Sequence, residues 1–262
     1  MKITRFKNID STNKYLQNLL EDGVDIIDNI VVADFQSLGK GQGCNVWESE
    51  SGKNLLFSVA LDMSYLKAEN QFLLTEMVSV AMINVLKNYL PEESLFIKWP
   101  NDIYFNNKKI AGILIKNEIK GMMLGTSIIG IGLNVNQTSF DESLPNPISM
   151  KMITGEDYNL EEILLAISCQ LSAVSNQQSD FVGQQSTVNS QQSSLTNFQF
   201  STFNFQLIYT RKLYRYRQWS FYEHEGTVKE MMIIGYDQFG RLILKEKNDR
   251  EVVCDLKEIV FI

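Results

Sequence analysis

Between Leu95 and Val135 the sequence alternates apolar, β-branched segments with short polar turns. The apolar segments are LFIKW, IYF, IAGILIK and MLGTSIIGIGLNV, and the turns include PND and NNKK. Apolar runs of this length between turn residues are typical of successive β-strands. Residues 30–35 and 54–62 have the same strand-like composition. A chain that joins so many strands by short turns builds a sheet, and we expect that sheet to be mostly antiparallel or mixed.

Three other segments have the pattern of helices. Ser11 or Thr12 can cap a helix that ends at Gly23, because the apolar residues between them fall on one face. Residues 70–90 are predicted to form a long amphipathic helix, and residues 160–173 a further one. The expected fold is therefore of the α+β class, a mixed β-sheet flanked by helices.

Composition divides the chain into three parts. Residues 173–206 are rich in Gln, Ser, Asn and Phe and carry a single charge, which is typical of a polar linker or an exposed helical connection. From about Tyr216 short strands alternate with turns such as DQFG and KNDR, as in a small β-barrel. We expect a main domain at residues 1–172, a connecting segment at 173–215 and a small β domain at 216–262.

Charge and cysteine content limit the partners and the compartment. A formal net charge of -7 disfavours sequence-independent binding to DNA, which depends on clustered Lys and Arg. No run approaches the roughly 18 apolar residues of a bilayer-spanning helix, and the N-terminus has no apolar core of a secretory signal. The three cysteines form no C-x-x-C pair, which fits a reducing compartment. We expect a cytoplasmic protein that binds neither DNA nor membranes.

The stretch from Phe35 to Trp47, FQSLGKGQGCNVW, places three glycines around Lys40. It matches neither the P-loop pattern nor the dinucleotide pattern, whose third glycine would fall on Cys44. Glycine-rich backbone can still wrap an anion with its own N–H groups, and Lys40 adds a positive charge there. No arginine occurs between Arg5 and Arg211, so a phosphate site in that interval has to use lysines or backbone amides.

Two more clusters follow in the predicted sheet. Trp99-Pro100-Asn101-Asp102 is a rigid polar turn directly after a strand, and Lys109 opens a later strand shortly before Gly112. In IGIGLNVN, Gly130 and Gly132 alternate along a strand and therefore face the same side of the sheet. Glycines inside a strand usually mark a place that a ligand or another backbone approaches closely. This face is predicted to be cleared for a flat or extended ligand.

Together these segments resemble the biotin protein ligases. STN at a helix start, Q-x-x-G-K-G-Q before a Trp, SGKNLLFS, KWPND followed by KKIAGIL, and GIGLNVN occur in the order and spacing of that family, from Ile9 to about Asn136. The final KEIVFI segment resembles the family's C-terminal SH3-like domain. Some members carry an N-terminal DNA-binding helix-turn-helix, whereas here STN begins at Ser11, so the resemblance is to the form that lacks this domain.

The resemblance implies an ATP-dependent ligase. It would activate biotin to biotinyl-5'-AMP and pass the biotin to a lysine of a biotin carboxyl carrier protein or of the carrier domain of a biotin-dependent carboxylase. Two anions must be brought together, so the site needs fixed positive charge between them. The substrates implied are biotin and ATP, with Mg²⁺ on the phosphates, since Mg²⁺ needs few protein ligands. The metal-binding residues stay unassigned, and a homodimer stays open.

The resemblance assigns roles to individual residues. Lys109 and Lys40 would be the catalytic cations that bridge carboxylate and α-phosphate. Biotin would be bound by Ser11, Thr12, Asn13, Gln36, Gly39, Lys40, Gly41, Gln42, Lys109, Gly112, Gly130 and Gly132. ATP would be bound by Trp47, Asn101, Asp102 and Asn134, with Trp47 stacking on the adenine. The loop departs from the family pattern, where arginine is common at Lys40 and often recurs at Gln42 or Gly43, and glycine is usual at Cys44.

Two other functions stay open. A lipoate ligase or octanoyl transferase of the same broad fold would use the same lysine-centred chemistry on a linear acyl chain. A non-catalytic biotin-binding protein would keep the pocket without the reaction. STN and KWPND favour biotin over a linear chain.

Overall fold

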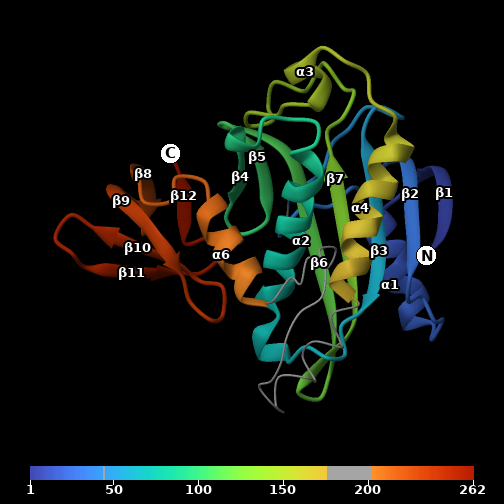
Figure 1. Ribbon diagram of the computed structural model, residues 1–262, viewed down its shortest axis with the longest axis horizontal. Helices are drawn as coiled ribbons and strands as arrows, with labels where there is room; N and C mark the ends of the chain where they lie inside the picture. The colour runs from blue at the N-terminus through green and yellow to red at the C-terminus, as the bar shows by residue number, and fades with distance from the viewer. Residues whose placement is uncertain (44, 176–201) are drawn as a thin grey trace, which may run out of the picture.

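A seven-stranded mixed β-sheet forms the centre of the computed structural model, which describes residues 1–43, 45–175 and 202–262. From edge to edge its strands are β1 (Lys2–Ile9), β2 (Asn29–Gln36), β3 (Leu55–Asp62), β7 (Met123–Leu133), β6 (Lys108–Lys120), β5 (Asp102–Phe105) and β4 (Leu95–Lys98) (Figure 1). β1 and β2 run parallel, and the other neighbouring pairs are antiparallel. The predicted mixed sheet is confirmed.

The first strand, β1, has no counterpart among the segments that sequence patterns predicted. None of its residues is buried, and its sequence KITRFKNI carries three basic side chains. An edge strand pairs on one side only and needs no apolar face, so neither alternation nor an apolar run marks it in the sequence. Its position follows from its pairing with β2, for example Arg5 opposite Val32.

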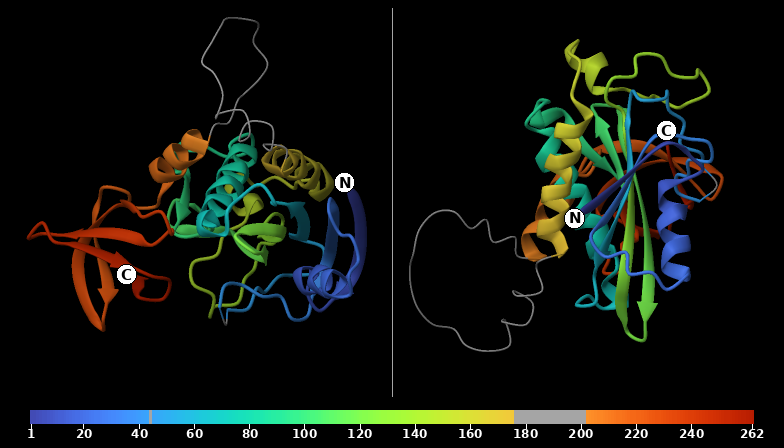
Figure 2. Two further views of the ribbon diagram at one scale, coloured as in Figure 1. Left: turned by 90° about the horizontal axis from the view of Figure 1, so that it is seen from below. Right: turned by 90° about the vertical axis from the view of Figure 1, so that its right-hand side faces the viewer.

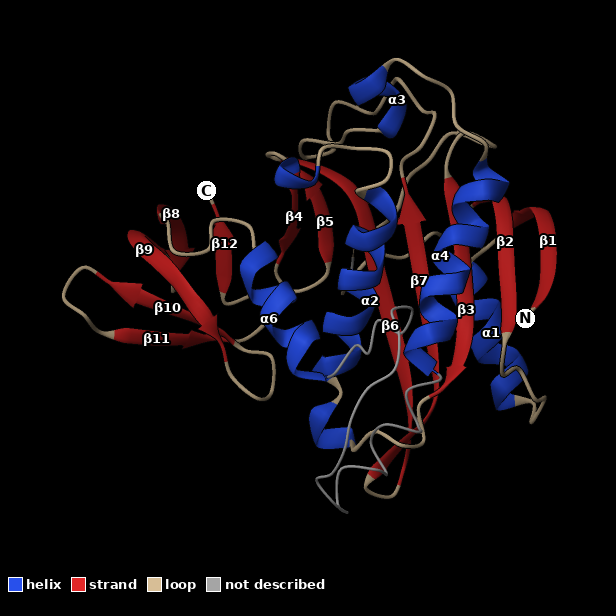
Figure 3. Ribbon diagram, in the orientation of Figure 1, coloured by secondary structure: helices blue, strands red, loops and turns tan. Residues whose placement is uncertain are grey.

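Helices cover both faces of the sheet (Figure 3). In the side view of Figure 2, α1 (Thr12–Glu21) lies on one face and α4 (Leu160–Ser175) on the other. Ser11 caps α1, and Gly23 follows its end with φ +76°. The remaining helical elements are η1 (Ala68–Asn70), α2 (Phe72–Leu86), η2 (Glu92–Ser94), α3 (Met150–Thr154) and α6 (Thr202–Lys212). None of the helices in the described ranges combines the length and apolarity of a bilayer-spanning segment.

Helix α2 differs from the amphipathic helix that we predicted for residues 70–90. It is shorter, and every residue from Met77 to Ile83 is buried. The reason is its position, since it packs against the sheet strands β4 and β5 and against both α4 and α6. A helix enclosed by neighbours on all sides has no polar face, so the predicted amphipathicity is wrong.

The C-terminal residues form a second, antiparallel sheet. Its order is β11 (Glu251–Cys254), β10 (Leu242–Glu246), β9 (Thr227–Tyr236), β8 (Trp219–His224) and β12 (Ile259–Phe261). β11 and β12 lie at opposite ends of this order, so ladder pairing in the described chain does not close a barrel. Buried residues of this sheet, among them Tyr222 and Ile233, belong to the same hydrophobic core as α2 and the large sheet.

The expected connecting segment, residues 173–215, is partly structured. Residues 176–201 lie outside the described part, and α4 extends to Ser175. Thr202–Lys212 forms α6, whose Phe205 and Tyr209 are buried. α6 therefore contributes to the core beside α2, with Tyr209 packed edge-to-face on Phe72 at 5.7 Å between ring centroids.

Candidate functional site

A cavity of about 110 Å³ lies at the start of α1, between the glycine-rich loop and the strands β3, β6 and β7. It brings together most of the residues that the sequence singled out, although they come from five separate segments of the chain. Of those residues, the ones that line it are Ser11, Thr12, Asn13, Gln36, Lys40, Gly41, Gln42, Trp47, Asp102, Lys109, Gly112, Gly130 and Gly132.

One end of this cavity is a network of polar side chains at the N-terminus of α1. The backbone N–H of Thr12 donates to Gln36 Oε1 at 2.7 Å, and the Thr12 hydroxyl lies 2.8 Å from that of Ser58. Asn13 Nδ2 reaches the carbonyl of Leu114 at 3.4 Å. These bonds hold donors and acceptors in fixed positions around a small polar space. Ser58 was missed by sequence reasoning, and its only signal is a hydroxyl inside the apolar run NLLFSVALD.

The floor of the cavity is the glycine surface of β6 and β7. Gly112 and Gly132 are paired across the two strands, and Gly130 pairs with Leu114. The indole of Trp47 lies flat against this surface. A Cβ placed on Gly132 would be 2.7 Å from Trp47 Nε1, and one on Gly112 would be 3.0 Å from Trp47 Cζ3. Glycine at these two positions is therefore what admits a flat ring.

Lys109 stands at the edge of this floor. Its Nζ lies 2.7 Å from Asp102 Oδ2 and 5.6 Å from the centre of the Trp47 ring. The pairing of β5 with β6 shifts here, with Tyr104 opposite Lys109 and Ile103 opposite Ala111, so one residue of β6 bulges. Bulges often re-aim a side chain beside a functional site. Both charged side chains remain about 30% exposed, so an anionic ligand could reach the lysine.

The glycine-rich loop folds back on itself as a short hairpin, described at residues 39–43 and 45–47, with Lys40 paired antiparallel to Val46. Gly41 N–H donates to the carbonyl of Asn45 at 2.8 Å, and Trp47 N–H donates to that of Gly39 at 2.9 Å. Gly39 does not line the cavity; a Cβ there would lie 2.6 Å from the carbonyl oxygen of Trp47, so its role is to let the hairpin close. The hairpin holds Lys40 at the mouth of the cavity and Trp47 on its floor.

A second cavity, of about 360 Å³, adjoins the first. Trp47 and Lys109 line both cavities, as do Asn45 and Val46 of the hairpin. Asn134, expected on the nucleotide side, lines this second cavity, and its Oδ1 is buried without a hydrogen-bond partner in the described residues. The rest of the lining was not predicted and comprises Asn45, Val46, Glu48, Phe140, Leu144, Pro145 and Pro147. The pair of prolines in SLPNP was the available signal for a rigid loop there.

Asn101 lies apart from both cavities. Its side chain is buried, and its Nδ2 donates to the carbonyl of Ile113. This bond ties the turn before β5 to β6 and so fixes the strand that carries Asp102. In the structure Asn101 supports the strand that carries Asp102, and its predicted contact with ATP stays a prediction.

Metal-binding geometry is absent from the described ranges. No group of three or more His, Cys, Asp or Glu side chains there could hold a metal ion. Asp102 is the acidic side chain in the first cavity, and it is paired with Lys109.

Comparison with known proteins finds similarity to one family over the part of the chain that carries the first cavity. Residues 6–134 match the model of the Biotin/lipoate A/B protein ligase family. The chain is 31% identical over 141 residues to the bifunctional ligase/repressor BirA of Escherichia coli. This alignment covers 53% of this chain and 42% of the E. coli protein. It is 38% identical over 114 residues to BirA of Bacillus spizizenii, covering 43% and 34%. The chain thus spans between about a third and two fifths of these relatives.

Solved structures share the fold over almost the whole chain. A biotin protein ligase from Aquifex aeolicus in complex with biotin and ATP superposes with a TM-score of 0.73 at 23% identity, covering 99% of this chain and 97% of that one. A biotin protein ligase from Leishmania major in complex with biotin gives a TM-score of 0.62 at 19% identity, covering 98% and 99%. At these identities the likeness establishes the fold alone.

Proposed function

We propose that this chain, whose residues 6–134 belong to the Biotin/lipoate A/B protein ligase family, activates biotin with ATP and transfers it to a lysine of a biotin carboxyl carrier protein. The observation that carries the proposal is the pair of adjoining cavities, with Lys109 and Trp47 among the residues that line both. A reaction that joins two substrates needs two neighbouring sites and a cation where the reacting groups meet.

In the first step a biotin carboxylate oxygen attacks the α-phosphorus of ATP, and the bond to pyrophosphate breaks. Both reactants are anions, so positive charge between them lowers the barrier. Lys109 lies where the two cavities meet, and its ion pair with Asp102 holds the ammonium in place. Lys40 adds a second charge from the hairpin. Held in this way, the two groups react without first reorganising solvent.

Each cavity suits one substrate. The small cavity offers fixed donors and acceptors at Thr12, Asn13 and Gln36 to the ureido ring of biotin, and a close-packed floor to its apolar part. The larger cavity offers the face of Trp47, the free Oδ1 of Asn134 and apolar side chains to the adenine. The exocyclic amine of adenine would be a fitting donor to that buried oxygen.

In the second step the amine of the carrier lysine attacks the acyl carbon of biotinyl-5'-AMP, and AMP leaves with the electron pair of the broken bond. The intermediate is reactive toward water, so the hairpin of residues 39–47 would shelter it until the carrier arrives. Mg²⁺ would enter with the nucleotide substrate, because this ion keeps several water ligands and needs few from the protein. The assignment to the cytoplasm rests on cysteine usage. A homodimer could form through an exposed edge of the large sheet, whose order ends at β1 and at β4.

Exchange of labelled pyrophosphate into ATP, measured separately with biotin and with lipoate, tests the proposal. We expect exchange that depends on biotin, and its loss in Lys109→Ala with an unchanged circular dichroism spectrum. Exchange that depends on lipoate would instead assign the chain to the linear-acyl branch of the family. No exchange with either acid, together with calorimetric binding of biotin, would identify a non-catalytic biotin-binding protein.

A further inference from the structure

The turn between β11 and β12 of the C-terminal sheet touches the glycine-rich hairpin at its tip. A Cβ placed on Gly43 would lie 3.2 Å from Cε and 3.3 Å from Nζ of Lys257, and no other described atom outside its chain neighbours comes within 4 Å of that position. Gly43 follows Gln42, which lines the first cavity. The end of the Lys257 side chain is therefore held beside the loop that covers the candidate site.

The backbone at Lys257 is unusual for a lysine. Its φ of +74° lies in the left-handed region, which glycine adopts freely and L side chains adopt rarely. Such conformations persist where the surroundings enforce them and are frequent at functional sites. Here the conformation carries the side chain across to the hairpin, although a glycine would fit the turn with less strain.

Among the described residues the ammonium of Lys257 has no partner of its own. No ion pair or side-chain hydrogen bond engages it within residues 1–43, 45–175 and 202–262, and the residue is exposed. The neighbouring carboxylate of Glu258 accepts instead from the backbone N–H of Asp255 at 2.7 Å. An unpaired cation beside a glycine-rich loop is available to an anionic ligand.

The candidate site is short of positive charge for a triphosphate. Lys40 is the one cation of residues 37–47, the charge of Lys109 is offset by Asp102, and no arginine occurs between Arg5 and Arg211. We infer that Lys257 completes the anion site from the C-terminal sheet, with its ammonium binding the phosphates of ATP that leave as pyrophosphate. This inference rests on the proposed function and names a nucleotide-binding residue that lies outside the matched residues 6–134.

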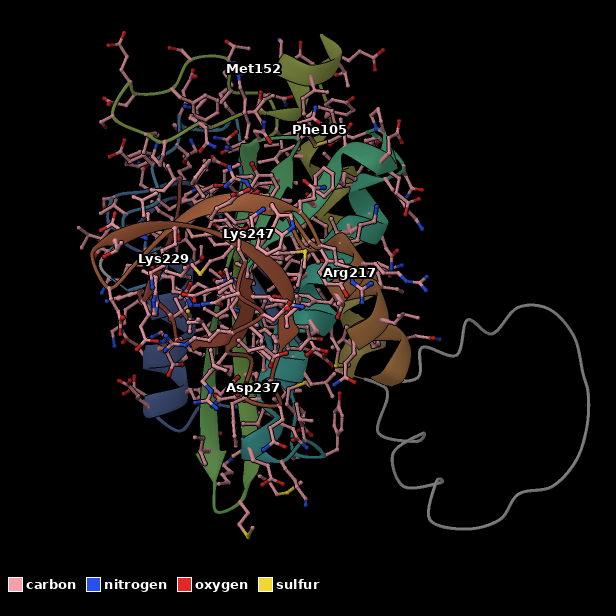
Figure 4. The ribbon with its side chains drawn as sticks, turned by 90° about the vertical axis from the view of Figure 1, so that its left-hand side faces the viewer. Phe105, Met152, Arg217, Lys229, Asp237 and Lys247 are labelled. Carbon is pink, nitrogen blue, oxygen red and sulfur yellow. The ribbon has the colours of Figure 1, made fainter. Side chains whose placement is uncertain are left out.

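The test uses the full chain and two lysines of the same sheet. Lys257→Met keeps the length and apolar contact of the side chain and removes its charge, and Lys257→Arg restores the charge. Lys247→Met is the matched control, because Lys247, labelled in Figure 4, pairs with Glu230 and lies over the ring of Trp219. We expect Lys257→Met to raise the KM for ATP in biotin-dependent exchange about tenfold, the effect of one charge-assisted hydrogen bond. The KM for biotin should change less than about twofold on the same scale.

An unchanged KM for ATP in Lys257→Met would overturn the inference, as would an equal rise for ATP and biotin, which would mean that Lys257 acts only by holding the loop. Calorimetric titration with a non-hydrolysable ATP analogue gives the same comparison without catalysis. If wild type does not exchange pyrophosphate, the proposed function fails, while the titration still decides the role of Lys257.

Lys257→Gly separates function from stability. Removing the side chain relieves the left-handed backbone, so the midpoint of thermal unfolding should rise by about 2 °C. Affinity for the ATP analogue should nevertheless fall as it does in Lys257→Met. A glycine variant that binds the analogue as well as wild type does would contradict the inference.

Discussion

At the scale of single residues, the site depends on how Trp47 is accommodated. Its indole rests on Gly112 and Gly132, faces Lys109 and lines both cavities. Its Nε1 is buried without a hydrogen-bond partner in the described chain. A buried N–H in that state is unfavourable, so a ligand acceptor that reaches it would gain both a bond and the relief of that penalty.

Gly132→Ala tests this arrangement. The added Cβ would lie 2.7 Å from Trp47 Nε1, so the indole has to move off the floor. We expect the affinity for biotin and for ATP to fall at least about tenfold and the free energy of unfolding to fall by about 1–3 kcal/mol, as in other overpacked sites. Calorimetric titration and urea unfolding would measure the two effects.

Gly125→Ala is the matched control in the same strand. The new Cβ would meet Glu118 Oε2 at 2.7 Å and the aliphatic part of Lys120, which are ends of flexible side chains that can turn away. Its affinity for both substrates should equal that of wild type. Equal losses of affinity in the two variants would show that β7 tolerates no added side chain at either glycine, and that the contact with Trp47 is not the reason.

At the scale of elements, α2 carries a buried acid. Glu76 is 2% exposed, and its Oε2 has no hydrogen-bond partner among the described residues. Burial raises the pKa of this carboxyl from 4.5 to about 7, and a hydrogen bond with Tyr236 lowers it by less. Tyr236 comes from β9, and its ring packs 5.3 Å from that of Tyr209 in α6. The acid therefore lies where α2, α6 and the C-terminal sheet meet.

Stability should depend on pH through Glu76. Because its pKa is higher in the folded chain, the folded state holds the proton more tightly between pH 4.5 and about 7. The contribution of Glu76 to the free energy of unfolding is therefore complete below pH 4.5 and is lost as pH rises through about 7. The loss is on the order of 3 kcal/mol. Urea unfolding of wild type and Glu76→Gln between pH 5 and pH 8.5 would measure it.

The glutamine variant should lack this pH dependence. Its free energy of unfolding relative to that of wild type should therefore rise by about 2 kcal/mol between pH 5 and pH 8.5. Glu69→Gln serves as the control, because Glu69 lies in η1, pairs with Lys67 at 3.4 Å and is exposed. The Glu69 variant should follow wild type at every pH. Parallel curves for wild type and Glu76→Gln would mean that Glu76 is already ionised in the folded chain at pH 5.

At the scale of the whole molecule, the C-terminal sheet packs against the domain that contains the candidate site and is hydrogen-bonded to it. Trp99 Nε1 donates to the carbonyl of Gly240 at 2.9 Å, and Trp99 stands three residues before Asp102. The ring of Phe72 at the start of α2 lies against the same glycine. The turn between β9 and β10 thus binds both the KWPND turn and α2. The two sheets share one hydrophobic core across this contact.

Gly240→Ala should separate these parts. A Cβ there would lie 2.6 Å from Cε2 of Phe72, and its φ is +83°. We expect the free energy of unfolding to fall by about 3 kcal/mol or more, from the collision and the backbone strain together. Gly226→Ala carries the same kind of strain at φ +69° with nothing within 4 Å, so it should lose only about 1 kcal/mol. Urea unfolding would compare them, and equal losses would show that the contact with Phe72 adds nothing.

The sequence by itself determined the features that depend on neighbours along the chain. The cap at Ser11, the turns between the strands, the alternation of Gly130 and Gly132 and the lysine at the start of β6 each follow from residue types at fixed short spacings. These features were enough to predict the mixed sheet and most of the residues that line the first cavity. They failed for β1, which pairs at an edge without an apolar pattern.

Only the tertiary structure decided which distant segments meet. Packing on all sides made α2 a buried helix. Tertiary packing also brought Phe140 and Pro147 into the lining of the second cavity with Trp47, bonded Asn101 to the Ile113 carbonyl and set Lys257 beside Gly43. None of these contacts leaves a periodic or local signal, because each joins residues whose separation along the chain is arbitrary. Their energies come from burial and close packing in three dimensions, which no single stretch of the sequence expresses.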